Sequence, residues 1–375
     1  MNHPDEKSNT QITVCAGCGA ALQTTDSGEP GYIPEAALAR TPAICQRCYR
    51  IKHYNEVSRI AIDQAEFLRI LGKIAGENCL VVHIVDLFDF EGSLIAGLHR
   101  FIGQNPILLV ANKADLLPKG INPNRIVNWL QRQTKLAGLK TDGIVLTSAK
   151  SGAGFARAVE AIAELRRGRD VYVVGATNVG KSTLLNRLIR NHSDLDAELT
   201  VSRYPGTTLD LIKIPLDDGK AVVDTPGIVY NHRLSELAAA EDLPFLMPDK
   251  PIKPLVFQLN PEQTLFFGAF ARFDFLRGER KPFTLFVANA LPVHRTKLTN
   301  ADDLFRRHRG VMLSPPPLAR LDELPPFTVQ RFKVRGGQDL SISGLGWIKV
   351  SGESGAEVQI HVPKGVKVAI RDSLV

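Results

Sequence analysis

Short apolar runs recur along the middle of the chain and are separated by longer polar or mixed stretches. Runs of this length, rich in Val, Ile and Leu, predict buried strands at 80–85, 107–110, 144–146, 171–174, 209–214 and 221–223. Between most of them apolar residues recur at helical spacing, most clearly at 154–166 and 183–190. This alternation predicts an α/β domain with a mostly parallel, doubly wound sheet and a ligand at the carboxyl ends of its strands.

The last third of the chain has a different pattern. From about residue 254 onward, short alternating runs and frequent Gly and Pro turns predict a mainly β structure, which the runs at 339–350 and 356–371 continue. In 327–335 the alternation places Arg331, Lys333 and Arg335 on one face of a strand, together with Phe327 and Val329. Three basic side chains in line would suit a row of phosphates.

Composition limits the class of protein. The 375 residues are 44% hydrophobic and 23% charged, which is ordinary for a soluble globular protein and excludes a disordered chain. At about 150 residues per domain, the length predicts two or three domains. No apolar run approaches the roughly 18 residues that span a bilayer, and the polar first residues resemble neither a signal nor a transit peptide. We therefore expect a cytoplasmic protein that does not act at a membrane.

The positive charge is concentrated near the C-terminus. The chain has 46 Lys and Arg against 39 Asp and Glu, a net charge of +7. Residues 251–375 contain 18 of the basic and 11 of the acidic residues, so the whole excess lies there. Arg306 and Arg307 form a second basic cluster in this part. A polyanion such as RNA would be met here; the alternative is a solvated basic surface.

Four of the five cysteines form two C-x-x-C pairs, Cys15/Cys18 and Cys45/Cys48. In a reducing compartment four thiolates predict a closed, structural zinc site rather than disulfides. The 26 residues between the pairs exceed the usual spacing, so a long loop must cross between them. The alternative is two unrelated redox or surface pairs. The following segment, RCYRIKHY at 47–54, mixes basic and aromatic residues, which fits RNA contact and a solvated helix start equally well.

The strongest motif follows the run at 171–174, where residues 175–182 read GATNVGKS. This is G-x-x-x-x-G-K-[ST] between a predicted strand and a predicted helix, the arrangement of a P-loop. Backbone N–H groups there would surround phosphates, while Lys181 reaches the β- and γ-phosphates and Ser182 binds Mg²⁺. The expected phosphate-binding residues are Gly175, Asn178, Val179, Gly180, Lys181, Ser182 and Thr183.

Two further motifs complete the phosphate side. Residues 224–227 read DTPG, so Asp224 is expected to hold Mg²⁺ through water and the Gly227 N–H to meet the γ-phosphate. Residues 205–208 read PGTT and predict a switch loop in which Thr208, rather than Thr207, binds the metal. The expected Mg²⁺ ligands are Ser182, Thr208 and Asp224, and the expected catalytic residues are Lys181, Asn178, Thr208, Asp224 and Gly227.

Motifs for the base precede the P-loop. Residues 112–115 read NKAD after one predicted strand, and 148–150 read SAK after the next. Asp115 could accept hydrogen bonds from the N1–H and the amine of guanine, which adenine cannot supply. The expected guanine-binding residues are Asn112, Lys113, Asp115, Ser148, Ala149 and Lys150. This pair of motifs argues against a metabolic ATPase or kinase.

The motif order N-K-x-D, S-A-K, P-loop, P-G-T-T, D-T-P-G resembles that of the circularly permuted GTPases. Joining old ends and opening new ones is permissible, because the termini of a compact domain often lie close together. With CAGCG…CQRCYRIKHY and the basic β-rich tail, the chain resembles the YqeH family of ribosome-biogenesis GTPases over essentially its full length. The resemblance implies a GTPase that assembles the small (30S) ribosomal subunit, with 16S rRNA as partner and RNA binding by the C-terminal third.

The residue after D-T-P-G bears on catalysis. Ras-type enzymes orient the attacking water with a Gln at this position, whereas this chain has Ile228. Related GTPases with Asn at the place of Asn178 use it to bind K⁺, so the resemblance implies a slow, K⁺-stimulated GTPase. The alternative is that Asn178 only braces the loop.

We expect three units: a zinc module at 1–57, a circularly permuted GTPase domain at 58–235, and a linker with a basic, β-rich RNA-binding domain at 236–375. The protein is expected to be a monomer that does not bind DNA. Two other functions stay open, an RNA-binding scaffold that uses GTP as a structural ligand and a GTPase of tRNA modification. The chain runs from DTPG directly into the C-terminal domain. A change from bound GTP to bound GDP could therefore change the position of that domain.

Overall fold

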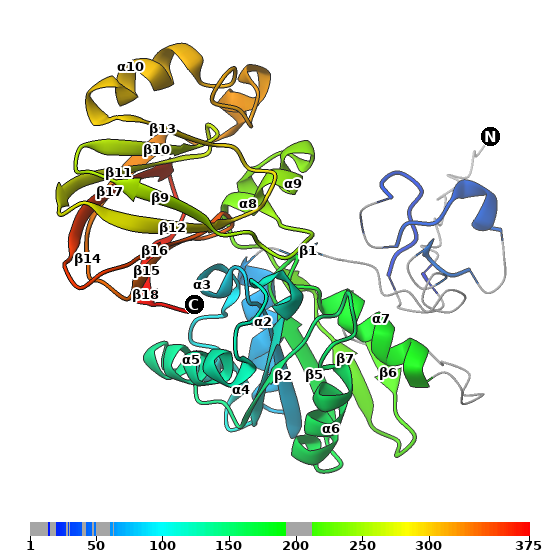
Figure 1. Ribbon diagram of the computed structural model, residues 1–375. Coiled ribbons are helices and arrows are strands. Elements are labelled where there is room, and N and C mark those ends of the chain that lie inside the picture. The colour runs from blue at the N-terminus through cyan, green and yellow to red at the C-terminus, as the bar shows by residue number, and fades with distance from the viewer. Residues whose placement is uncertain are drawn as a thin grey trace, which may run out of the picture.

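The computed structural model describes residues 14–15, 20–27, 29, 31–39, 43–46, 49, 61–62, 64–192 and 212–375. Figure 1 shows two large units in this part of the chain, an α/β domain and a β-rich C-terminal domain. The described N-terminal segment contains the short helix η1 (Glu35–Ala37). The predicted division into an α/β and a β-rich part is confirmed.

The α/β domain is built on a six-stranded sheet in the order β4-β3-β2-β5-β7-β6. Neighbouring strands are parallel except β6, which is antiparallel to β7. Every residue of β2 and β3 is buried, as expected for central strands that are covered on both faces. The strands are β2 (Cys79–Asp86), β3 (Ile107–Asn112), β4 (Gly143–Leu146), β5 (Asp170–Gly175), β6 (Ile212–Pro215) and β7 (Ala221–Asp224). Five match the predicted runs closely; of the run at 209–214, residues 209–211 lie outside the described residues.

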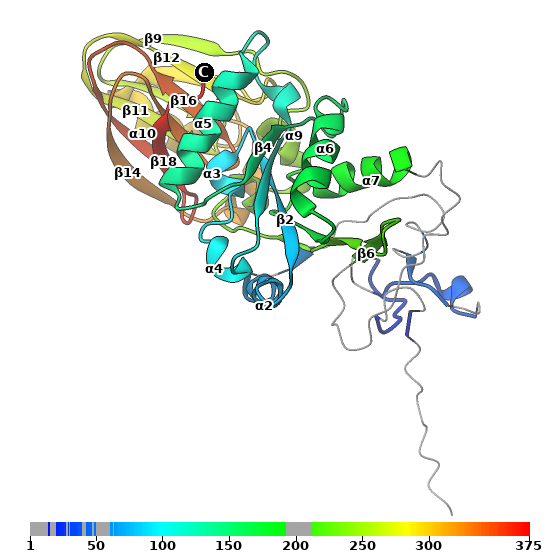
Figure 2. The same cartoon turned by 90° about the horizontal axis from the view of Figure 1, so that it is seen from below.

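Helices cover both faces of this sheet, with α6 and α7 on one side and α3 and α5 on the other (Figure 2). The predicted helices at 154–166 and 183–190 correspond to α6 (Phe155–Arg166) and α7 (Lys181–His192). The other helical elements are α2 (Gln64–Ile74), α3 (Phe90–Ser93), α4 (His99–Ile102), η2 (Ala114–Leu116) and α5 (Pro123–Leu136). A separate two-stranded pair joins β1 (Ala61–Ile62) to β8 (Gly227–Ile228). Within the described part of the chain, no helix has the length and apolar character needed to cross a membrane.

The C-terminal domain packs two five-stranded antiparallel sheets face to face, in the orders β13-β10-β11-β17-β14 and β18-β15-β16-β12-β9. Aromatic rings from both sheets meet in its core, where Phe273 and Phe275 lie 5.1 and 5.0 Å from Phe283 between ring centroids. The predicted runs at 339–350 and 356–371 each divide into two strands at a turn. The strands are β9 (Leu255–Leu259), β10 (Gln263–Phe267), β11 (Ala271–Gly278), β12 (Lys281–Val287), β13 (Val293–Lys297), β14 (Phe327–Val334), β15 (Gln338–Ile342), β16 (Gly346–Val350), β17 (Ala356–Pro363) and β18 (Val368–Asp372).

Short helices connect this domain to the α/β domain and lie outside its sheets. The connection from the α/β domain contains α8 (Leu234–Leu237), η3 (Ala240–Asp242) and α9 (Leu243–Leu246). Helix α10 (Leu298–His308) lies outside one sheet, and η4 (Leu318–Glu323) follows it. The predicted domain boundary at 235/236 falls inside α8.

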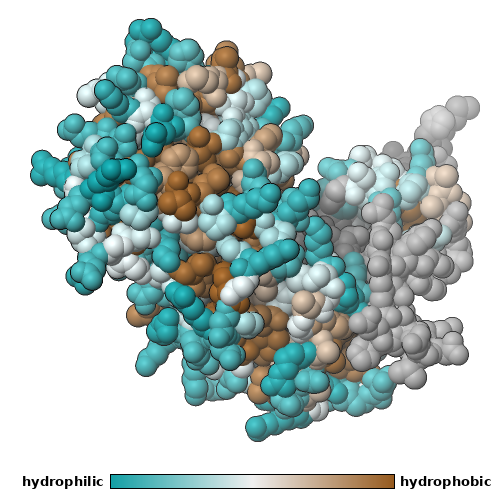
Figure 3. Space-filling model, in the orientation of Figure 1, coloured by the Kyte–Doolittle hydropathy of each residue, from teal (hydrophilic) through white to brown (hydrophobic). Residues whose placement is uncertain are grey.

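The two domains share an apolar cluster at their junction. Trp129 of α5 belongs to the same buried cluster as Phe286 and Trp347 of the C-terminal domain. Its indole Nε1 donates to the carbonyl of Asp372 at 2.8 Å. Arg371 stacks over both tryptophan rings, 5.0 Å from Trp129 and 5.1 Å from Trp347. Figure 3 shows apolar surface on the C-terminal domain and beside this junction, within an otherwise largely hydrophilic face.

Candidate nucleotide-binding site

The P-loop connects β5 to α7 at the carboxyl edge of the sheet. Two of its glycines cannot carry a side chain. A Cβ on Gly175 would lie 2.7 Å from the Ile84 carbonyl, and one on Gly180, whose φ is +90°, would lie 2.2 Å from the Asn112 amide nitrogen. Val179 is fully buried in the core of the α/β domain, so its side chain anchors the loop to that core. Asn178 has a φ of 61°, in the left-handed region that non-glycine residues rarely adopt.

The charged groups of the phosphate side lie together. The Lys181 ammonium is 2.9 Å from an oxygen of Asp224, at the end of β7, and also donates to the Thr225 carbonyl. Lys181, Ser182 and Asp224 are all nearly buried, whereas Thr183 is exposed. A serine hydroxyl and a carboxylate are the hard oxygen donors that Mg²⁺ prefers, so these two residues fit the metal. Thr207 and Thr208 lie outside the described residues.

Gly227 lies against the P-loop. A Cβ there would come within 3.3 Å of the Thr177 Cα, and the Thr177 N–H donates to the Ile228 carbonyl at 2.9 Å. The Ile228 side chain is fully buried in the core of the α/β domain. The Ile228 side chain therefore faces the core. A residue that positions an attacking water would have to face the phosphates instead.

The predicted base-binding loops meet the P-loop through Asn112. Its side chain donates to the Val179 carbonyl at 2.7 Å and accepts from the Ala149 N–H at 2.8 Å and the Thr147 hydroxyl at 3.2 Å. The Ala149 amide, expected to face guanine, is thus bonded to Asn112. One side chain therefore joins the three loops that follow β3, β4 and β5.

The other residues of these loops are held in different ways. Lys113, with a φ of 65°, extends its ammonium to within 2.6 Å of an Asp86 oxygen at the end of β2. Asp115 is half-buried in η2, and Ser148 is buried. Lys150 donates to the carbonyl of Asp249 at 2.7 Å.

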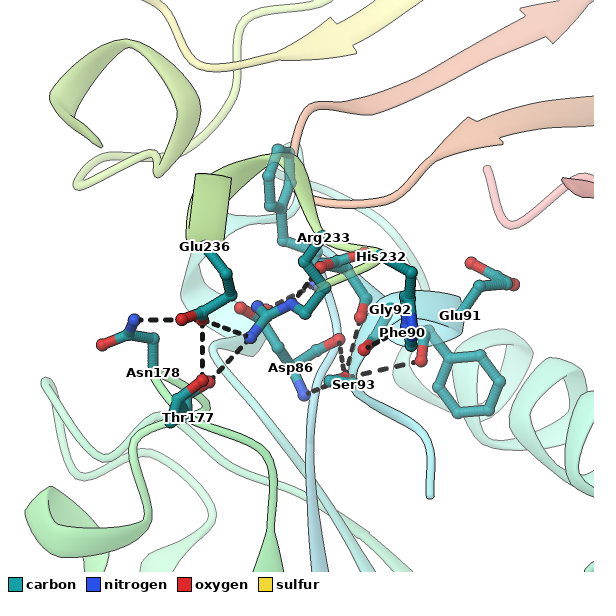
Figure 4. A network of polar contacts seen from close by, with 12 residues as sticks. Asp86, Phe90, Glu91, Gly92, Ser93, Thr177, Asn178, His232, Arg233 and Glu236 are labelled. Atoms are coloured by element: carbon teal, nitrogen blue, oxygen red, sulfur yellow. Dashed lines mark hydrogen bonds and ion pairs between the residues drawn. The ribbon is translucent and has the colours of Figure 1, made fainter. Parts of the chain in front are cut away.

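Two contributors were missed by the sequence reasoning. Arg187 of α7 donates to the carbonyls of Ala149 and Lys150, each at 3.2 Å, and so ties the S-A-K loop to the helix that follows the P-loop. Glu236 of α8 accepts from the Thr177 hydroxyl at 2.7 Å (Figure 4). Neither Arg187 nor Glu236 belongs to a recognisable sequence motif, because the residues that they contact lie far away in the chain.

The cysteine module is described only in part. Cys15 and Cys45 are both buried, and the Cys45 N–H donates to the Cys15 sulfur at 3.1 Å. Cys18 and Cys48 lie outside the described residues. The residues that the structure does describe contain no group of three or more His, Cys, Asp and Glu side chains placed to hold a metal ion. The four-cysteine zinc site stays a prediction.

The predicted basic residues of the C-terminal domain are exposed on one sheet and its helix. Along β14, Arg331 and Lys333 are exposed while Val334 is buried, as the alternation predicted, and Arg335 follows the strand. Arg306 and Arg307 form ion pairs with Asp303 at 2.6 and 3.0 Å in the last turns of α10.

Between α10 and β14 lies an open groove of about 390 Å³. Its lining residues are Arg272, Asp302, Phe305, Arg306, Arg309, Phe327 and His361. Arg272 is paired with the buried Asp274 at 2.7 Å and also with Asp302. The exposed cations of the lining are Arg309 and Arg306, and Arg306 is paired with Asp303.

Comparisons with known proteins agree with this geometry. Residues 280–374 match the family model "YqeH-like, C-terminal", and residues 170–263 match "50S ribosome-binding GTPase". The chain is 48% identical over 363 residues to the uncharacterized protein YqeH of Bacillus subtilis, covering 96% of this chain and 99% of that protein. It is 30% identical over 433 residues to NO-associated protein 1, chloroplastic/mitochondrial, of Arabidopsis thaliana, covering 98% and 77%. The site is a GTPase site that uses GTP and Mg²⁺, and the chain belongs to the YqeH family.

Proposed function

We propose that this GTPase is a switch protein that acts in the assembly of the small ribosomal subunit by binding its rRNA in the cytoplasm. The observation that carries the GTPase part is the convergence of the P-loop, N-K-x-D and S-A-K loops on Asn112 at one edge of the sheet. The ribosomal part is supported by the family resemblance and by the exposed basic side chains of the C-terminal domain. The description of the matched GTPase model names the 50S subunit, so the choice of subunit is the point to test.

The roles follow from the chemistry of each group. Lys181 and the P-loop amides would hold the phosphates, while Ser182, Thr208 and Asp224 would hold Mg²⁺. Asp115 would accept from the guanine edge. Hydrolysis of GTP would then release the switch loops, since the γ-phosphate is what orders them.

We also propose that the domain is circularly permuted. Strands β3 and β4, which carry the base motifs, precede β5 and β7, which carry the phosphate motifs. All of them nevertheless form one sheet, with β2 and β5 paired at its centre. A change in chain order that leaves the spatial order of a GTPase sheet intact supports permutation.

K⁺ is proposed as an activating ion bound at Asn178. With Ile228 buried, the charge that builds up in the transition state needs stabilisation from another group. Turnover measured in KCl and in NaCl at equal ionic strength tests this, and a rate several-fold higher in KCl is expected. Equal rates would leave Asn178 with the bracing contact that it makes to Glu236 at 3.4 Å.

A structural zinc ion bound by Cys15, Cys18, Cys45 and Cys48 is proposed for the N-terminal module. The buried N–H···S contact between Cys45 and Cys15 supports it, because backbone donors commonly surround metal-bound thiolates. Metal analysis of the purified protein should give one zinc per chain, and the Cys15→Ser, Cys45→Ser variant should give none.

RNA contact is proposed for the groove and the neighbouring β14 face. Phe305 and Phe327 would offer rings for base stacking, and Arg306, Arg309, Arg331 and Lys333 would meet phosphates. Arg307 and Arg335 lie close enough in the chain to extend this basic surface.

Gradient co-sedimentation with purified 30S and 50S subunits tests the proposed function. GDP and a non-hydrolysable GTP analogue are compared in each case. Migration with 30S that depends on the bound nucleotide is the expected result. Association with 50S alone, or with neither subunit, would contradict the small-subunit role and leave the GTPase chemistry standing. Negligible hydrolysis even with bound subunits would favour an RNA-binding scaffold.

A further inference from the structure

A carboxylate from outside the GTPase motifs touches two consecutive side chains of the P-loop. Glu236 Oε1 accepts from the Thr177 hydroxyl at 2.7 Å and from the Asn178 amide at 3.4 Å (Figure 4). These are the third and fourth residues of the motif GATNVGKS. The contact thus reaches the part of the P-loop that the D-T-P-G segment also packs against.

Arg233 completes this contact from the same short helix region. Its guanidinium donates to Glu236 at 3.2 Å, to the Thr177 carbonyl at 2.8 Å and to Asp89 at 2.8 Å. Arg233 is 1% exposed. A buried guanidinium that donates to two carboxylates is fixed in direction by them, so it holds the Glu236 side chain toward the loop.

The helix that carries Glu236 is attached to the C-terminal domain. Leu234 is fully buried in the core of the β sandwich, and its N–H donates to the Ser343 carbonyl at 2.8 Å. Gly344, with a φ of +79°, allows this approach, because a Cβ there would lie 2.6 Å from the Ser235 nitrogen. Helix α8 therefore contacts the C-terminal core with one side and the P-loop with the other.

We propose that Glu236 is a positioning residue for GTP hydrolysis, through which the C-terminal domain holds the P-loop in its working conformation. Asn178 has a left-handed φ, which Asn adopts more readily than most non-glycine residues but which is held in place by its surroundings. The Glu236 contacts supply such a constraint. Because small displacements of catalytic groups can cost up to about 100-fold in rate, loss of this constraint lowers turnover. The proposal rests on the GTPase activity and is independent of the ribosomal role.

The first test compares kcat and KM for GTP in full-length wild type, Glu236→Ala, Glu236→Gln and Glu241→Ala. Glu241 is an exposed glutamate on the neighbouring η3 and serves as the matched control. We expect Glu236→Ala to lower kcat about 10-fold or more with KM changed much less. Glu236→Gln keeps an acceptor for the Thr177 hydroxyl and should retain most of the rate. The wild-type rate tests the GTPase itself, while the ratio between variants tests Glu236.

A double-mutant cycle separates positioning from general destabilisation. If Glu236 acts through Thr177, then Thr177→Val and Glu236→Ala together should slow hydrolysis no more than the stronger single change. Thermal melting of each variant reports on folding. An unchanged kcat in a folded Glu236→Ala protein would overturn the proposal, as would additive effects in the cycle.

The attachment to the C-terminal domain has its own test. Gly344→Ala should displace α8 without touching the P-loop. It is expected to lower kcat in the wild-type background but to add little in Glu236→Ala. An equal further loss in both backgrounds would contradict transmission through Glu236.

Discussion

Asp115 is the residue on which base selectivity depends in the proposed site. If Asp115 is replaced by Asn, the side chain presents an N–H donor to the guanine amine, which is itself a donor. The carboxylate that would accept two hydrogen bonds from guanine is lost. Two unsatisfied groups cost about 3 kcal/mol together, or roughly 100-fold in GTP affinity. Asp115→Asn should therefore lower kcat/KM for GTP by this amount and gain activity with xanthosine triphosphate, whose C2 carbonyl accepts. The exposed Asp217→Asn is the control; an unchanged preference for GTP in the Asp115 variant would contradict the assignment.

His83 makes the stability of the α/β domain depend on pH. It lies fully buried in β2, where burial lowers its pKa to about 3, and its Nε2 accepts from the Ile95 N–H at 3.4 Å. Between this value and the ordinary pKa near 6.5, the unfolded chain binds a proton that the folded protein excludes. The stability that the neutral ring contributes is thus complete above pH 6.5 and declines toward pH 3, by up to about 1.4 kcal/mol per pH unit.

Urea denaturation at pH 7 and pH 5 should show this decline in wild type. A His83→Leu variant should have a smaller difference between the two pH values, even if its stability at pH 7 is lower. The same difference in both proteins would assign the pH dependence to other groups.

At the scale of elements, Asn112 joins the loops of three strands. Its replacement by Ala leaves the buried Val179 carbonyl and Ala149 N–H without this partner. The expected cost is about 3 kcal/mol of unfolding free energy, with a higher KM for GTP because the loops separate. Asn122→Ala is a matched control: Asn122 caps α5 away from the site, so it should cost about 1 kcal/mol and leave KM unchanged. Equal KM in both variants would contradict this role.

At the scale of the whole molecule, Arg371 connects the two domains. Its side chain is 2% exposed, forms an ion pair with Glu91 of the α/β domain, and stacks on Trp129 and Trp347. Arg371→Ala leaves Glu91 and the buried Asp339 without their cation, so we expect a loss of about 3–5 kcal/mol in urea denaturation. The exposed Arg335→Ala should change stability by less than about 0.5 kcal/mol. A similar small effect for Arg371 would show that the domains are held by the apolar cluster alone.

The sequence was sufficient for the features that are local in the chain. Continuous apolar runs between turns marked β2, β3 and β5, because strands covered on both faces need apolar side chains at every position. Gly175 and Gly180 were recognisable because the P-loop requires close backbone approach at a fixed spacing. The alternation at 327–335 likewise predicted which side of β14 is exposed, since side chains alternate between the two faces of a strand.

Only the tertiary structure decided how these pieces act on one another. Thr177 and Glu236 are 59 positions apart, and Trp129 and Asp372 are 243 apart. No periodicity or spacing records such contacts, because they depend on how helices and sheets pack after each has formed. The sequence by itself therefore determined the GTPase motifs and the two kinds of domain. Packing decided that Asn112 joins three loops and that a glutamate fixed to the C-terminal core touches the P-loop.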